Sequence, residues 1–329
     1  MGVTQSKCDA ALPPVGAPPP ASDFAATFET PEVVALKAPG QFERLHEDVK
    51  KLVNVNTFEG CKFELAKPLT PMFQTAHSLW LGGSHYPNAN SHYKFSATVG
   101  DNERVCIASM DQYGTLEGQV YATMLKVFQG KFIFHLPSDP SGGLVAVADV
   151  DFNGANANAQ LKLAHNVHGQ KGALVGASYM QTISNSLAMG GEGSVSLDDP
   201  SATVSLAAKY AGLKHSATAT LTKSTAPGND ALSLHYHRAV SPRVQLGTEL
   251  MLSPQTLEAQ VASGAEFSLK SSRVNLSIDG AGKMCSVVET ALSPAAKLAF
   301  SGEVQFGARD ETGKHADEFK FGYSLQIGQ

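Results

Sequence analysis

The sequence predicts an all-β transmembrane barrel of about nineteen strands. From about residue 59 to the C-terminus, apolar and polar residues alternate in segments of about 8 to 11 residues, separated by Gly, Asn, Asp, Ser or Pro. No stretch reaches about 18 consecutive apolar residues, so a membrane crossing would have to use strands. Every proline after residue 60 falls between these segments, as expected because proline cannot donate a hydrogen bond to a strand ladder.

Residues 1 to 38 are predicted to form a separate, Pro-rich arm. Residues 1 to 40 hold seven of the 17 prolines, set among Ala, Ser and Gly, and this composition cannot bury enough apolar surface to fold. We therefore expect a disordered, partly polyproline segment. Its first residues fit an N-myristoylation pattern at Gly2, and Cys8 would supply a palmitoylated second anchor. A plain disordered terminus is the alternative.

One convincing helical pattern spans Gln41 to Leu52, and we place a pore helix at residues 39 to 54. Charged side chains cover the polar side of this helix, while the apolar residues that recur at helical spacing are Phe42, Leu45, Val49 and Leu52. Such a short helix is unstable alone, and its apolar face is narrow. We expect it to lodge inside the barrel with its apolar side chains against the wall.

Residues 55 to 329 are assigned to the barrel itself. A soluble β-sandwich also alternates, but it would seldom run to this many strands in series without helices. A closed membrane barrel leaves no open edge, and it turns its apolar face to lipid and its polar face to a water-filled lumen. A soluble β-rich binding protein is the disfavoured alternative.

Several functional classes are disfavoured by composition and motifs. The net charge of −5 and the absence of any basic run argue against nucleic acid as a partner. The 4 cysteines form no CxxC pair, and His235 and His237, two apart on one strand face, lack an evident third metal ligand. No nucleophile elbow, phosphate loop or paired-carboxylate constellation is present. We expect no enzyme, no cofactor and no metal.

Several short stretches together resemble a known family. They are residues 39–40, 58–62, 73–78, 110–112, 114–116, 179–183, 187–192, 236–239, 244–247 and 279–283. With the helix before them, they look like the general import pores, which are the channel-forming subunits of the translocase of the outer mitochondrial membrane within the mitochondrial porin superfamily. The likeness covers nearly the whole chain after residue 38.

The resemblance implies a nineteen-stranded barrel with the helix inside it and with parallel first and last strands. It also implies that the last strand carries the insertion signal of mitochondrial outer-membrane barrels, at Lys320, Gly322, Leu325 and Ile327. The implied function is translocation of precursor proteins across the mitochondrial outer membrane. The alternative is a metabolite porin similar to the voltage-dependent anion channel.

The implied partners are precursor proteins with their presequences, small single-helix subunits and receptors of the translocase, the barrel sorting and assembly machinery, membrane lipids and further copies of the chain. Acidic patches would attract the Lys and Arg of basic presequences, although the same charges also simply solvate a water-filled lumen. The acidic residues that we predict to face the lumen and bind precursors are Glu117, Asp149, Asp151, Glu192, Glu249, Glu258, Glu266 and Glu303.

Overall fold

The computed structural model describes residues 39–83, 91–101, 103–125, 127–138, 143–166, 172–198, 201–225, 230–309 and 315–328. The predicted arm at residues 1 to 38, with its two candidate lipidation sites Gly2 and Cys8, lies outside these residues. The described strands form one continuous 19-stranded sheet.

The strands follow one another along the chain with short connections. Their bounds are Gly60–Thr70 (β1), Phe73–Leu81 (β2), Ser91–Gly100 (β3), Arg104–Asp111 (β4), Leu116–Leu125 (β5), Phe128–Leu136 (β6), Val145–Asn153 (β7), Ala157–His165 (β8), Ala173–Ser184 (β9), Leu187–Ser196 (β10), Ala202–Ala211 (β11), His215–Ser224 (β12), Ala231–Ser241 (β13), Val244–Ser253 (β14), Glu258–Ser268 (β15), Ser272–Asp279 (β16), Lys283–Ser293 (β17), Ala296–Arg309 (β18) and His315–Ile327 (β19).

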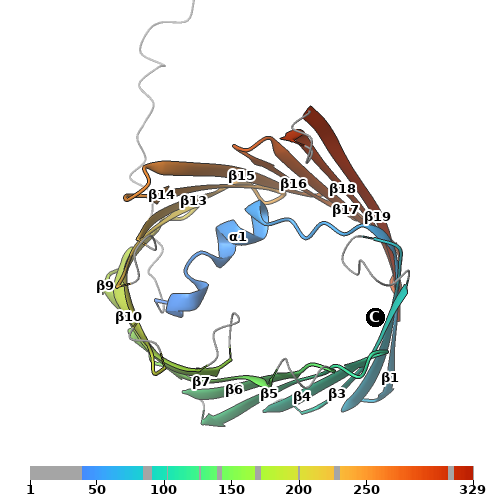
Figure 1. Cartoon of the computed structure of the whole chain (residues 1–329), viewed down its shortest axis with the longest axis horizontal. Coiled ribbons are helices and arrows are strands. Elements are labelled where there is room, and N and C mark those ends of the chain that lie inside the picture. The colour runs from blue at the N-terminus through green and yellow to red at the C-terminus, as the bar shows by residue number, and fades with distance from the viewer. Residues whose placement is uncertain are drawn as a thin grey trace, which may run out of the picture. The chain divides into compact units, whose positions relative to one another are not determined.

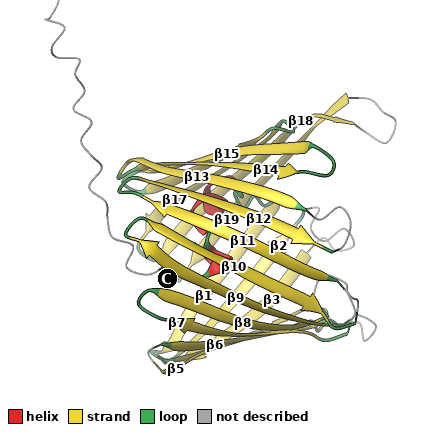
Figure 2. Ribbon diagram, turned by 90° about the vertical axis from the view of Figure 1, so that its left-hand side faces the viewer, coloured by secondary structure: helices red, strands yellow, loops and turns green. Residues whose placement is uncertain are grey.

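The sheet closes on itself into a barrel (Figures 1 and 2). Each strand pairs antiparallel with the next one in the chain, and β1 closes the ring by pairing parallel with β19, in a register that sets Gly60 beside Gly322 and Leu65 beside Ile327. An odd number of strands in alternating directions leaves the first and last pointing the same way. The predicted barrel with parallel first and last strands is therefore confirmed.

Side chains along each strand alternate between the lumen and the outer surface. On β19, Lys320 lies 3.8 Å from Glu303 of β18 across the inner face, while Phe321 and Tyr323 are 67% and 56% exposed on the outer face. Large exposed apolar side chains recur in this way on most of the strands. Such an outer surface is suited to lipid and not to water.

The inner helix is shorter than the sequence pattern predicts. A 3-10 turn at Phe42–Arg44 (η2) is followed by a break at Leu45 and His46 and then by the α-helix Glu47–Val53 (α1). The predicted continuous helix over 41–52 is thus corrected. The break allows the two halves to pack on different parts of the curved wall, because η2 lies against β9 and β10 whereas α1 lies against β13 to β16. No helix in the described ranges is long and apolar enough to span a membrane.

Candidate functional site

The candidate site is the lumen together with the segment of residues 39–58 that crosses it (Figure 1). The apolar side chains of this segment are turned away from the water of the lumen. Their exposed fractions are 8% for Phe42, 3% for Leu45, 4% for Val49 and 2% for Leu52. Burial of each such side chain contributes roughly 1.5–3 kcal/mol, so apolar packing holds the segment inside the barrel.

The N-terminal half of the segment is held by a small apolar cluster. Phe42 and Leu45 pack with Met180, Ala188 and Ala207, which come from the inner faces of β9, β10 and β11. Met180 and Ala188 are fully buried. The lumen wall therefore has an apolar patch at this place, covered by η2.

Polar contacts fix the same half of the segment against β7 and β8. The Gln41 side-chain amide donates to Asp151 at 3.0 Å, and Glu43 forms an ion pair with Lys162 at 2.9 Å. Partial burial raises the pKa of Glu43, but the hydrogen bond and charge of Lys162 outweigh it, so the pKa lies below its ordinary value. Glu43 is thus held as a carboxylate next to its partner.

His46, at the break between η2 and α1, is clamped by the wall. Its two ring nitrogens lie 2.8 Å from the Thr218 hydroxyl and 2.7 Å from the Thr220 hydroxyl, both on β12. A neutral imidazole can satisfy both hydroxyls, donating at one nitrogen and accepting at the other. The ring also stacks on His235 of β13 at a centroid distance of 3.9 Å, and His235 lies 3.2 Å from Glu249.

Acidification is expected to loosen the segment through His46. Burial, followed by the neighbouring His235 and Lys50, lowers the pKa of His46 from 6.5 to about 4. Because the folded value is the lower one, the stabilisation is complete above pH 6.5 and is lost as the pH falls towards about 4. Single-channel conductance should change over this interval, and His46→Gln, which keeps a donor and an acceptor, should remove that part of the change. Identical pH profiles for the two proteins would contradict this role.

The C-terminal end of the segment is tied to the last strands. The Thr57 hydroxyl donates to Glu303 at 2.6 Å, and the Phe58 backbone N–H donates to the Ser301 hydroxyl at 2.9 Å. Gly322 of β19 lies next to this part of the segment, where a Cβ atom would overlap the carbonyl oxygen of Phe58. The glycine of the predicted insertion signal therefore also makes room for the chain as it enters β1.

The other residues of the predicted insertion signal alternate as the sequence suggests. Lys320 faces the lumen near Glu303, whereas Leu325 and Ile327 belong to the outward-facing set. Their role in recognition stays a prediction.

All the predicted precursor-binding acids fall on the inward-facing positions of their strands, but most already have partners. Lys94 pairs with Glu117, Lys131 with Asp149 at 3.8 Å, His235 with Glu249 at 3.2 Å, Arg273 with Glu266 at 3.5 Å, and Lys283 with Glu303 at 3.0 Å. Among the described residues, Glu192 and Glu258 form no ion pair and no hydrogen bond. Glu192 and Glu258 are therefore the predicted acids without a direct partner among the described residues, and their binding role stays a prediction.

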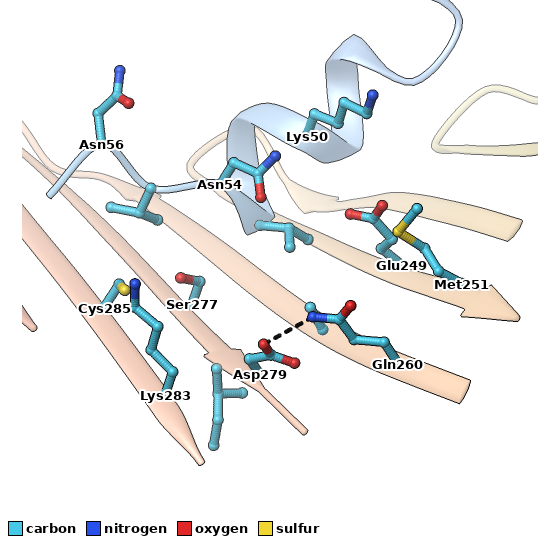
Figure 3. Close-up of a pocket in the computed structure, with 14 residues that line it drawn as sticks. Lys50, Asn54, Asn56, Glu249, Met251, Gln260, Ser277, Asp279, Lys283 and Cys285 are labelled. Carbon is cyan, nitrogen blue, oxygen red and sulfur yellow. Dashed lines mark hydrogen bonds between the residues drawn. The ribbon is translucent and has the colours of Figure 1, made fainter. Parts of the chain in front are cut away.

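A polar cavity of about 500 Å³ lies beside the C-terminal end of α1 (Figure 3). Lys50 reaches it from the helix, while Glu249, Asp279 and Lys283 line it from the wall. Among the residues that line the cavity, the Gln260 side-chain amide donates to the Asp279 carboxylate at 3.1 Å. Charges of both signs line this cavity, as expected for a lumen that favours neither anions nor cations strongly.

The structure gives the candidate histidine pair two separate environments. His235 is buried beneath His46, whereas His237 lies 3.3 Å from the side-chain oxygen of Gln245. Throughout the described residues, no group of three or more His, Cys, Asp or Glu side chains is placed to hold a metal ion.

Sequence reasoning missed the polar anchors of the segment. Gln41 and His46 look like ordinary solvated residues on the polar side of a helix, and Thr218 and Thr220 look like ordinary lumen residues. Their partners are more than 100 residues away in the chain, so spacing carries no signal for them.

Curated relatives are similar over most of their length. A "Mitochondrial import receptor subunit TOM40 homolog" of Xenopus laevis is 28% identical over 73% of this chain and 70% of its own. The "Mitochondrial import receptor subunit TOM40" of Saccharomyces cerevisiae is 24% identical over 84% and 76%, respectively. Among solved structures, a mutant porin of Rhodopseudomonas blastica aligns with a TM-score of 0.45 at 10% identity, covering 78% of this chain and 98% of that chain.

A family model matches most of the chain. The model described as "Eukaryotic porin" matches residues 38–322. The matched range begins just before the inner segment and ends within β19, so it takes in the inner helix and nearly all of the barrel. The chain belongs to the eukaryotic porin family.

Proposed function

We propose that this protein is a protein-conducting channel of the mitochondrial outer membrane, through which precursor proteins pass without catalysis or nucleotide. The observation that carries the proposal is the sequence likeness to import receptor subunits, which extends over 73% of the chain for the Xenopus laevis relative and 84% for the yeast relative. The closed barrel supplies the path, and the exposed apolar outer surface fits a membrane location.

The chemistry of the lumen supports a polypeptide as the transported molecule. Acidic side chains recur on the inner faces of strands around the ring, and most of them are balanced by a nearby cation. A wall of this kind binds the basic segments of a precursor weakly and at many places, so the precursor can move along the lumen. A metabolite porin resembling the voltage-dependent anion channel is the second candidate, and the names of the relatives do not favour it.

The proposal includes partners on both surfaces of the wall. Precursor chains occupy the lumen, and small single-helix subunits and receptors dock on the lipid-facing surface, where apolar side chains are exposed. Insertion by the barrel sorting and assembly machinery and association with further copies of the chain belong to the same proposal.

The decisive experiment is purification of the native protein from mitochondria in mild detergent, with a photo-crosslinkable precursor arrested during import. We expect a large assembly that contains single-helix subunits, and crosslinks from the precursor to lumen positions. An isolated barrel without subunits or crosslinks, together with marked anion preference in planar bilayers, would favour the metabolite porin instead.

Removal of the two predicted lumen acids that have no direct partner is expected to weaken presequence binding. In the double variant Glu192→Gln and Glu258→Gln, a basic presequence peptide should block the channel less often. The blocking frequency should fall by about threefold for each carboxylate removed, because each carboxylate attracts the Lys and Arg of the peptide through water and salt that partly screen the charges. The control is the same peptide with its Lys and Arg replaced by Gln, whose blocking frequency should not respond. Equal blocking of both channels by the basic peptide would remove these residues from the proposed path.

A further inference from the structure

Two glycines of the wall lie directly under α1. Gly247 of β14 and Gly264 of β15 face each other across the strand pair, at inward-facing positions. We propose that this pair, the glycine seat, positions α1 against the wall and thereby sets the free cross-section of the pore. The inference needs only that the chain forms a channel, and it is independent of what the channel carries.

Gly264 faces the backbone of the helix. A Cβ atom at this position would overlap the carbonyl group of Leu52 and lie 2.8 Å from the backbone nitrogen of Val53. A side chain could rotate away from such a contact, but the backbone of a packed helix can only move as a body. Any residue larger than glycine at 264 must therefore push the end of α1 towards the lumen.

Gly247 faces side chains of the helix. A Cβ atom there would lie 3.0 Å from Cδ1 of Leu52 and 3.4 Å from Cγ1 of Val49. These contacts are tight, but rotation of the leucine side chain can relieve part of them. Substitution at 247 should consequently displace the helix less than substitution at 264.

Backbone conformation does not require glycine at either position. Neither residue is among the positive-φ glycines of the described chain, and both lie within regular strands. Glycine in a strand interior weakens the strand and often marks a close approach by another backbone. Space for α1 is the role that the structure assigns to both glycines.

Gly176 of β9 provides the matched control. It also occupies an inward-facing strand position, yet a Cβ atom there would have its nearest neighbours at 3.6 Å, which is ordinary contact. Gly176→Ala should therefore leave α1 in place. Gly176→Ala adds the same methyl group as the two test variants, but this methyl group does not meet α1.

The test compares Gly264→Ala, Gly247→Ala and Gly176→Ala in the full chain. Spin labels are attached at position 51 on α1 and position 129 on β6, in a background with all four cysteines changed to Ser. Their separation reports the distance from the helix to the opposite side of the wall. Planar-bilayer recordings of the same variants report conductance. We expect the mean label distance to shift by at least about 1 Å in Gly264→Ala, since overlapping atoms must separate to van der Waals contact. Conductance should change in the same order of variants: 264 most, 247 less and 176 not at all.

The glycine seat can still be tested if one of the variants fails to assemble. If Gly264→Ala does not assemble, Gly247→Ala decides, and its effect relative to Leu52→Ala alone should be smaller when the two changes are combined, because the contact with Cδ1 of Leu52 at 3.0 Å is then gone. Label distances and conductance equal to wild type in both Gly264→Ala and Gly247→Ala would overturn the seat. So would a change in Gly176→Ala as large as theirs.

Discussion

Leu325→Arg is expected to leave the protein unassembled and degraded. Leu325 belongs to the outward-facing set of β19 and is paired with Leu298 of β18 and Phe63 of β1, so the new charge would enter the lipid-facing surface at the seam where the barrel closes. An arginine on that face costs up to about 2 to 4 kcal/mol at the bilayer midplane. The substitution also alters the predicted insertion signal. Accumulation of the assembled protein in mitochondria after native electrophoresis measures the effect.

Neighbouring positions provide the controls for this result. Gln326→Arg should assemble normally, because Gln326 faces the lumen and already hydrogen-bonds to Glu64 at 2.6 Å. Ile327→Arg should be milder than Leu325→Arg in its membrane cost, since Ile327 is paired with Ala296 at the beginning of β18, close to the rim. Equal assembly of Leu325→Arg and Gln326→Arg would contradict the expected cost of a charge at the lipid-facing position 325.

The double variant Leu45→Asp and Val49→Asp is expected to release the inner segment from the wall. Both side chains are almost completely buried, 3% and 4% exposed, so the change removes apolar burial and introduces two carboxylates into an apolar contact. We expect a barrel that still assembles, because its strand pairing does not involve these residues, and a higher and noisier single-channel conductance.

Lys51→Ala is the control for the released helix. The Lys51 side chain is 65% exposed, and its ion pair with Glu47, at 2.8 Å, is a surface pair within one helix turn. Such pairs contribute about 0.3–0.5 kcal/mol, so conductance should stay at the wild-type level. Unchanged conductance in the double aspartate variant as well would place the segment outside the conducting path.

The strands were predictable because their information is local. A period of two and the turn residues between segments each follow from the geometry of a single strand, and the closed ring of 19 strands agrees with that count. The expectation that every proline after residue 60 lies between strands is wrong at Pro68, which lies inside β1 beside a register shift between Pro68 and Thr70, where an irregular strand tolerates a proline. The inward-facing position of the predicted acids follows from the same alternation. The parallel closure of β1 on β19 came with the family resemblance, and strand periodicity by itself does not reveal it.

The ion pairs of the lumen were not predictable in the same way. Periodicity places Glu249 and Glu303 on the inner face, but it does not show that the first lies beside His235 or that the second accepts a hydrogen bond from Thr57. Such partners depend on strand register and on where the inner segment crosses. Most of the predicted precursor-binding acids consequently have a positively charged partner nearby that the sequence pattern does not reveal.

The sequence by itself determined the barrel, the face on which each strand residue lies and the apolar side of the inner helix, because each of these is a repeat read within one element. Only the tertiary structure decided that the helix breaks at His46, that Thr218 and Thr220 clamp that ring, and that Gly264 receives the helix backbone. These contacts join residues more than 170 positions apart in the chain, and they exist only once ring closure has brought the inner segment against strands β12 to β15.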